Sequence, residues 1–286
     1  MDLTTRMRST FKMLERDHGL VPVIVWEAGS RSWGYSTDKS DYDLRFVYIK
    51  KPWMSTVTNT DDTYRDDITF TDGMRFELQG FDLRKFMGML TRSDAFIHEI
   101  LAGGTMLAVG GGLKHIAPVA EKYIDKRAIC DAFYAQVRRN LMPKRSNKLT
   151  SKGVIHALRY AIMTEQMLDT YEIRPNLQVR DDMHNYSAFG SASAVQYTIQ
   201  HLRDNPDLTQ DQLHADPIVR DVFKFSEVLD RRVKYDLEKV PGGRTRDYTE
   251  ADLHFQAILR HYYHFQLEVQ LNWIDGIHYT SLVRSK

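Results

Sequence analysis

The sequence predicts an α+β protein: a small mixed β-sheet with flanking helices over residues 1–110, followed by an all-helical domain over residues 111–286. Apolar residues recur with the two-residue period of strands only in the first part of the chain. Beyond residue 110 the segments are long, charged and helix-periodic, and prolines separate them. The change of period predicts a domain boundary near residue 110, and the length suits one large domain or two smaller ones.

The elements follow in order. Met7, Phe11 and Leu14 share one face of a helix over residues 3–18, which Gly19 ends. Strands are expected at residues 22–28, 43–50, 67–71 and 74–79, and two short helices at residues 81–91 and 94–102. The remaining helices are expected near residues 113–141, 150–171, 189–204, 216–238 and 249–274.

The third and fourth strands form a hairpin whose register decides which face Glu77 occupies. Its Asp-Gly pair suggests a two-residue turn, but that register would mix polar and apolar residues on each face. A three-residue loop with Gly73 left-handed pairs Ile68 with Phe76 and keeps one face apolar. Because a buried face fixes the register, we expect this second arrangement, with Glu77 on the polar face.

The strongest functional pattern joins the first two strands. An apolar run leads into Gly29 and Ser30, and after a loop Asp41 and Asp43 stand at the start of the next apolar run. Residues two apart on a strand point to the same face, so the two carboxylates repel each other unless a cation neutralises them. Mg²⁺ takes one or two carboxylates plus substrate phosphates, and a Gly-Ser turn offers backbone N–H groups to a triphosphate.

Each part of this pattern has an ordinary alternative. An isolated Asp-x-Asp is usually a solvated turn, Gly-Ser is common in loops, and Glu77 alone would be an exposed glutamate. The ordered combination predicts a metal-dependent nucleotide site in which Glu77 joins Asp41 and Asp43.

These residues resemble the nucleotidyltransferase fold of the DNA polymerase beta superfamily and, more narrowly, the RNA repair pathway DNA polymerase beta family of predicted nucleotidyltransferases. Residues 27–34 match a Glu-x-Gly-Ser-Arg-x-Trp-Gly signature and residues 40–45 match Ser-Asp-x-Asp-x-Arg. Residues 80–85 match a Gly-aromatic-Asp-Leu-Arg-Lys segment, and Lys152 with residues 157–159 echoes a later helix. The similarity covers residues 20–180. It departs at Glu77, where the family usually has aspartate.

The resemblance implies transfer of a nucleoside monophosphate from a nucleoside triphosphate to an acceptor hydroxyl, with release of pyrophosphate. Asp41, Asp43 and Glu77 would be the catalytic residues and would hold two Mg²⁺ (or Mn²⁺) ions. The substrate-binding residues would be Gly29, Ser30, Arg31, Arg45, Lys152 and Arg159. In this set Gly29 and Ser30 hold phosphates, Arg31, Lys152 and Arg159 supply outer charge, and Arg45 orients an aspartate.

The acceptor stays open among three alternatives. An RNA end is slightly favoured, because the name of the family that the chain resembles implies it. The run from Arg138 to Lys152 holds basic residues and no acidic one, and could grip a triphosphate or an RNA backbone. The same run is equally consistent with a solvated loop, and the acceptor could then be a protein or small-molecule hydroxyl. A non-catalytic nucleotide- or RNA-binding module is the third alternative, although three convergent carboxylates argue against it.

The amino-acid composition indicates the class of protein and the compartment. A net charge of +1 gives no global attraction to nucleic acid, and 42% hydrophobic with 27% charged residues is ordinary for a globular protein. The single cysteine excludes an internal disulfide and favours a reducing compartment. With no apolar run of membrane length, we expect a cytoplasmic protein that does not enter the membrane. The oligomeric state is left open.

Overall fold

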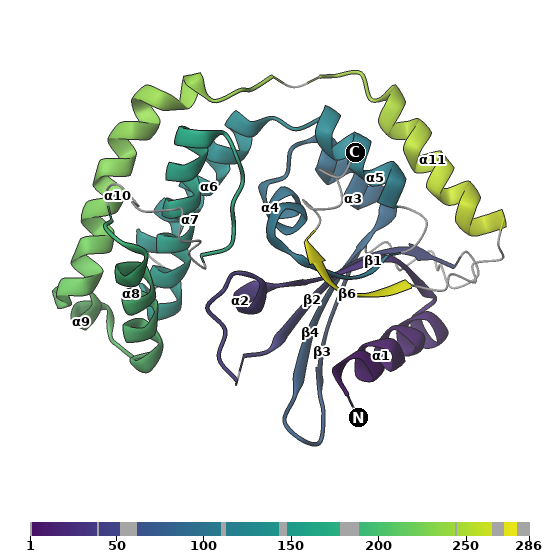
Figure 1. Ribbon diagram of the computed structural model, residues 1–286, viewed down its shortest axis with the longest axis horizontal. Coiled ribbons are helices and arrows are strands. Elements are labelled where there is room, and N and C mark those ends of the chain that lie inside the picture. The colour runs from purple at the N-terminus through teal and green to yellow at the C-terminus, as the bar shows by residue number, and fades with distance from the viewer. Residues whose placement is uncertain are drawn as a thin grey trace. The chain divides into compact units, whose positions relative to one another are not determined.

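The computed structural model of this chain describes residues 2–38, 40–51, 62–109, 113–142, 148–177, 189–243, 245–264 and 272–278 (Figure 1). Contacts group the chain into two compact units. The sheet unit contains Met1–Ser32, Ser36–Ile124 and Arg244–Lys286, and the helical unit contains Trp33–Tyr35 and Asp125–Gly243. The two units do not divide near residue 110, where we predicted a domain boundary, because helices after that residue pack on the sheet. The division into functional domains stays a prediction.

The sheet has six strands in the order β3-β4-β2-β1-β5-β6. All neighbours are antiparallel except β2 and β4, which are parallel, so the predicted mixed sheet is confirmed. The strands are β1 (Leu20–Ala28), β2 (Tyr42–Lys50), β3 (Thr63–Thr69), β4 (Arg75–Asp82), β5 (Thr105–Val109) and β6 (Asn272–His278).

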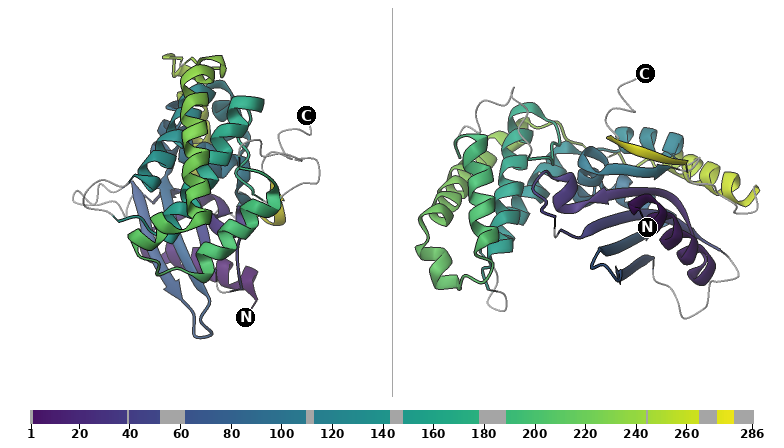
Figure 2. Two further views of the ribbon diagram at one scale, coloured as in Figure 1. Left: turned by 90° about the vertical axis from the view of Figure 1, so that its left-hand side faces the viewer. Right: turned by 60° about the horizontal axis from the view of Figure 1, so that its bottom comes forward.

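Helices cover both faces of this sheet (Figures 1 and 2). On one face α1 (Leu3–His18) packs Met7, Phe11 and Leu14 against the sheet, and Gly19 ends it in the left-handed conformation, as predicted. On the other face the core is shared by four helices. They are α3 (Leu83–Thr91), α4 (Ala95–Gly103), α5 (Leu113–Lys122) and α11 (Thr249–His264).

The helical unit contains α6 (Lys126–Leu141), α7 (Ser151–Thr170), α8 (Ala192–Asp204), α9 (Gln210–Ala215), α10 (Pro217–Asp236) and the 3₁₀ turn η2 (Leu237–Lys239). Asp125, Thr150 and Asp216 cap three of these helices by accepting hydrogen bonds from first-turn N–H groups. The short α2 (Gly29–Ser32) belongs to the sheet unit. No helix within the described ranges combines the length and apolar character needed to cross a bilayer.

One expectation about the C-terminal part is wrong. We predicted no strand after residue 110 and a helix over residues 249–274, but α11 ends at His264 and β6 pairs antiparallel with β5. The partner strand lies more than 160 positions earlier in the chain, so no local pattern announces the pairing. The short strand β5 was also missed, since it has only five residues and its sequence does not alternate between polar and apolar residues.

Candidate functional site

Two of the three predicted carboxylates are neighbours on adjacent strands of the sheet unit. In the parallel pair of β2 and β4, Asp43 lies opposite Glu77. The hairpin that carries Glu77 has the predicted three-residue loop: Gly73 has φ +86, and Ile68 pairs with Phe76. Asp41 lies two residues before Asp43, just ahead of the first residue of β2. The sequence therefore predicted correctly that Glu77 shares the face and the neighbourhood of Asp43.

Arg45 bridges these two carboxylates. Its Nη2 donates to Asp43 Oδ1 at 3.1 Å and to Glu77 Oε1 at 2.8 Å, and its Nη1 donates to the Glu77 carbonyl oxygen at 3.3 Å. Because both oxygens accept from the same nitrogen, their separation cannot exceed the sum of the two hydrogen-bond distances. The two carboxylates are therefore closer together than about 8 Å, the separation beyond which they could not share a pair of metal ions. The Arg45 side chain is only 10% exposed.

Asp41 has a different partner. Its Oδ2 lies 3.5 Å from Arg75 Nη1, while Arg75 Nη2 donates to Asp67 Oδ2 at 2.9 Å. Arg75 stands two residues before Glu77 on β4 and so shares its face. The sequence analysis missed Arg75 as a site residue, although the i, i+2 spacing to Glu77 was the available signal.

The glycine turn lies against Asp43. Gly29 has φ +70, and a β-carbon at this position would lie 1.8 Å from Asp43 Oδ2. Only glycine leaves the space that the carboxylate occupies, and only glycine adopts this backbone conformation without strain. The predicted association of the Gly-Ser turn with the aspartate strand is thus present within the sheet unit. Ser30 follows in α2 and is half-buried.

Arg31 holds the backbone that leads to Asp41. Its Nη2 donates to the Ser40 carbonyl oxygen at 2.8 Å and its Nε to the Asp41 carbonyl oxygen at 3.3 Å, and its guanidinium lies 3.9 Å from the Tyr42 ring centroid. Glu27 was not predicted as a site residue, and its Oε1 lies 4.0 Å from Arg31 Nε. Burial raises the pKa of Glu27, the Arg31 charge opposes this, and the Asp43 charge adds to it. Glu27 was already visible as the first residue of the matched signature.

Lys152 and Arg159 belong to the helical unit, where they share a face of α7 with His156. Lys152 is exposed. Arg159 is fully buried, with its guanidinium 3.7 Å from the ring centroid of Trp33, a residue of the same unit. Burial, followed by the charges of Arg159 and Lys152, lowers the pKa of His156 to about 4. This face therefore carries one exposed and one buried positive charge, and its role in substrate binding stays a prediction.

The basic run lies only partly within the described residues. Arg138 and Arg139 are exposed in the last turn of α6, and Lys148 is exposed ahead of α7. Lys144 and Arg145 lie outside the described residues. The alternatives of an RNA contact and a solvated loop both stay open.

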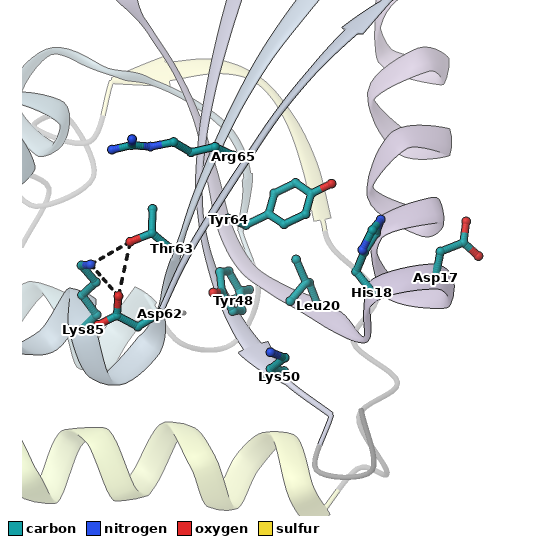
Figure 3. A pocket seen from close by; sticks show the side chains of 10 residues that line it. All are labelled: Asp17, His18, Leu20, Tyr48, Lys50, Asp62, Thr63, Tyr64, Arg65 and Lys85. Carbon is teal, nitrogen blue, oxygen red and sulfur yellow. Dashed lines mark hydrogen bonds and ion pairs between the residues drawn. The ribbon is translucent and has the colours of Figure 1, made fainter. Parts of the chain in front are cut away.

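A separate hollow of about 700 Å³ opens at the end of the sheet unit where β1 and β3 begin and β2 ends (Figure 3). Tyr64 points from β3 toward His18, whereas Thr63 and Arg65 point to the other side of the strand. Lys85 donates to Asp62 at 2.5 Å and to Thr63 at 2.7 Å. Asp43 and Glu77 do not line this hollow, so we assign the predicted chemistry to the carboxylate end and not to the hollow.

The donor set fits a divalent cation in chemistry but is not assembled around one. Carboxylate oxygens are the ligands that Mg²⁺ prefers, and Gly29 leaves room for Asp43. Yet within the described part of the chain no three His, Cys, Asp or Glu side chains form a group that could hold a metal ion. Instead, Arg45 donates to Asp43 and Glu77, and Arg75 lies 3.5 Å from Asp41.

The chain is similar to a known protein family and to individual known proteins. The RNA repair pathway DNA polymerase beta family matches residues 3–222. The uncharacterized protein YcgL of Bacillus subtilis (strain 168) is 31% identical over 98 residues, which cover 34% of this chain and 36% of that protein. A nucleotidyltransferase-like protein from Exiguobacterium sibiricum 255-15 aligns over 91% of this chain and 80% of its own, with 9% identity and a TM-score of 0.32.

The mixed sheet, the Gly-Ser turn and the paired carboxylates have the arrangement expected of the nucleotidyltransferase fold of the DNA polymerase beta superfamily. Because the family match spans most of its length, the chain belongs to the RNA repair pathway DNA polymerase beta family.

Proposed function

We propose that this protein transfers a nucleoside monophosphate from a nucleoside triphosphate to an acceptor hydroxyl and releases pyrophosphate. The observation that carries the proposal is the register of Asp43 opposite Glu77, with Gly29 in contact distance of Asp43. Three separate chain segments thereby bring the Gly-Ser turn and two carboxylates to one end of a sheet.

In the proposed reaction the acceptor oxygen forms a bond to the α-phosphorus, and the bond between the α- and β-phosphates breaks. Glu77 helps to remove the acceptor proton, and its side chain is accessible, at 46% exposed. Asp41, Asp43 and Glu77 would hold two Mg²⁺ (or Mn²⁺) ions. When bound, such ions stabilise the charge that develops on the attacking and leaving oxygens.

Gly29 and Ser30 would hold the β- and γ-phosphates through backbone N–H groups and the hydroxyl. Arg31 would act indirectly, because its hydrogen bonds to the Ser40 and Asp41 carbonyl oxygens fix the backbone that leads to Asp41. Lys152 and Arg159 would contribute positive charge from the helical unit, with Lys152 the accessible one of the two.

We propose an RNA end as the acceptor and a cytoplasmic setting. The description of the family as part of RNA repair and the exposed Arg138, Arg139 and Lys148 support the acceptor. The single cysteine supports the compartment. A protein or small-molecule hydroxyl is the competing acceptor.

The decisive experiment gives the full chain each α-³²P-labelled nucleoside triphosphate, Mg²⁺ or Mn²⁺, and a mixture of RNA and cell protein. We expect label in the RNA fraction and release of pyrophosphate. Label in protein or in small molecules would change the acceptor class, and absence of any transfer with all four nucleotides would favour a binding module.

Asp43→Asn should lower the rate of nucleotide transfer by at least about a hundredfold, because it removes the carboxylate that lies next to both the Gly-Ser turn and Glu77. Asp66→Asn is the matched control. Asp66 lies on β3 opposite Leu78, on the other face of the sheet, and accepts a hydrogen bond from the Tyr64 hydroxyl at 3.0 Å. Equal activity of Asp43→Asn and the unchanged protein would contradict the assignment.

A further inference from the structure

The guanidinium of Arg45 lies where two predicted metal-binding carboxylates meet. One nitrogen, Nη2, donates to both Asp43 Oδ1 and Glu77 Oε1, and the neighbouring Nη1 is anchored to the Glu77 carbonyl oxygen. The arrangement is fixed at three points and partly shielded: the Arg45 side chain is 10% exposed and that of Asp43 is 20% exposed, whereas Glu77 is 46% exposed.

The negative charges of Asp43 and Glu77 explain why a positive group lies between them. Two carboxylates on adjacent strands repel each other, and partial burial strengthens the repulsion. Arginine is the side chain best suited to neutralise them, because it stays charged and its planar group donates several hydrogen bonds in fixed directions. Arg45 therefore does for Asp43 and Glu77 what a bound metal ion would otherwise do.

The same oxygens cannot serve both cations fully. Mg²⁺ binds carboxylate oxygens at about 2.0–2.1 Å, and a guanidinium hydrogen-bonded to those oxygens would lie close to the ion and repel it. Starting from the function proposed above, we infer that Arg45 is a positioning residue that holds Asp43 and Glu77 in register without metal and opposes a divalent cation binding there on its own. Were a divalent cation bound at these oxygens, Arg45 would lose at least one of its two carboxylate bonds, and its guanidinium would then be available to triphosphate oxygens.

Arg75 offers a built-in comparison on the same sheet. It also pairs with a predicted metal-binding residue, Asp41, but at 3.5 Å, and both side chains are more than 40% exposed. An exposed pair at this distance is screened by water and salt. Removal of Arg75 should therefore change metal affinity much less than removal of Arg45.

The test measures Mn²⁺ binding to the full chain without nucleotide, by electron paramagnetic resonance and by calorimetry. Arg45→Met should bind Mn²⁺ at least about tenfold more tightly than the unchanged protein, because a competing positive charge is removed. Arg45→Lys, which keeps the charge but cannot make the three hydrogen bonds, should be intermediate. Arg75→Met should shift the affinity less than about threefold.

Thermal unfolding supplies a second readout that does not depend on catalysis. In EDTA, Arg45→Met should unfold at a lower temperature than the unchanged protein, because Asp43 and Glu77 lose their counter-ion. Added Mn²⁺ should raise its unfolding temperature by more than it raises that of the unchanged protein. If Arg45→Met does not fold, the comparison of Arg45→Lys with the unchanged protein decides.

Unchanged or weaker Mn²⁺ affinity in the folded Arg45 variants would overturn this role for Arg45 alone, provided that Asp43→Asn still abolishes Mn²⁺ binding. If Asp43→Asn in the Arg45→Met background leaves Mn²⁺ binding intact, the cation does not bind at these carboxylates, and the proposed function loses its metal site as well. The two failures are therefore distinguishable.

Discussion

At the scale of single residues, the arrangement around Asp43 was partly predictable. The alternation of strand residues places Asp43 and Arg45 on one face, and the hairpin register adds Glu77. The sequence could not indicate that Arg45 donates to both acids, because this contact depends on the parallel pairing of β2 with β4. Nor could it pair Asp41 with Arg75, since that contact depends on side-chain direction at the start of β2.

Gly29→Ala tests the close approach of the turn to Asp43. The left-handed backbone costs alanine about 1–2 kcal/mol, and the new β-carbon would also collide with Asp43 Oδ2 at 1.8 Å. Gly73→Ala is the control, since Gly73 has φ +86 and nothing within 4 Å of its added β-carbon. Urea denaturation should show a larger loss of stability for Gly29→Ala than for Gly73→Ala, and only Gly29→Ala should impair transfer. Equal effects would mean that Asp43 yields easily.

At the scale of elements, local patterns were sufficient for contiguous structure and insufficient for distant pairing. The register of the hairpin of β3 and β4 was predicted correctly because its turn and its buried face agree on one register, although β3 begins at Thr63 and β4 ends at Asp82, outside the predicted ranges. The pairing of β5 with β6 was missed because it joins segments more than 160 positions apart in the chain. The expected helix near residues 113–141 is two helices, α5 and α6, with a break after Lys122.

The parallel pairing that positions Glu77 also depends on a glycine in β4. Gly80 lies opposite Phe46 of β2, and a β-carbon there would lie 2.4 Å from Phe46 Cζ. Gly80→Ala should therefore lower the free energy of unfolding by about 1–3 kcal/mol through overpacking. In urea denaturation, the double variant Gly80→Ala/Phe46→Leu should lose less stability than the two single variants added together. Strict additivity would show that the ring is not the cause.

At the scale of the whole molecule, the order of the chain and the grouping in space differ. The helical unit takes in Trp33–Tyr35 from the loop that follows the Gly-Ser turn, and the sheet unit takes in α11 and β6 from the C-terminal part. Leu177 donates to the Trp33 carbonyl oxygen at 2.9 Å, and Arg159 covers the Trp33 ring. A boundary inferred from periodicity cannot detect such exchanges, because period reports local structure and not packing partners.

Buried His98 in the sheet unit and half-buried His156 in the helical unit both have a strongly lowered pKa, which predicts a response of protein stability to acid. Burial lowers the pKa of His98 in α4 and of His156 in α7 from 6.5 to about 4. Between these values the unfolded chain binds protons that the folded chain refuses, so stability falls as pH falls from about 6.5 to about 4. Each histidine contributes at most about 3 kcal/mol to this loss. Urea denaturation from about pH 7 to about pH 4.5 should show a shallower acid loss for His98→Gln and for His156→Gln than for the exposed control His214→Gln. If the loss of stability with falling pH is the same in His98→Gln or in His156→Gln as in the unchanged protein, the pKa of that histidine is not lowered in the folded protein.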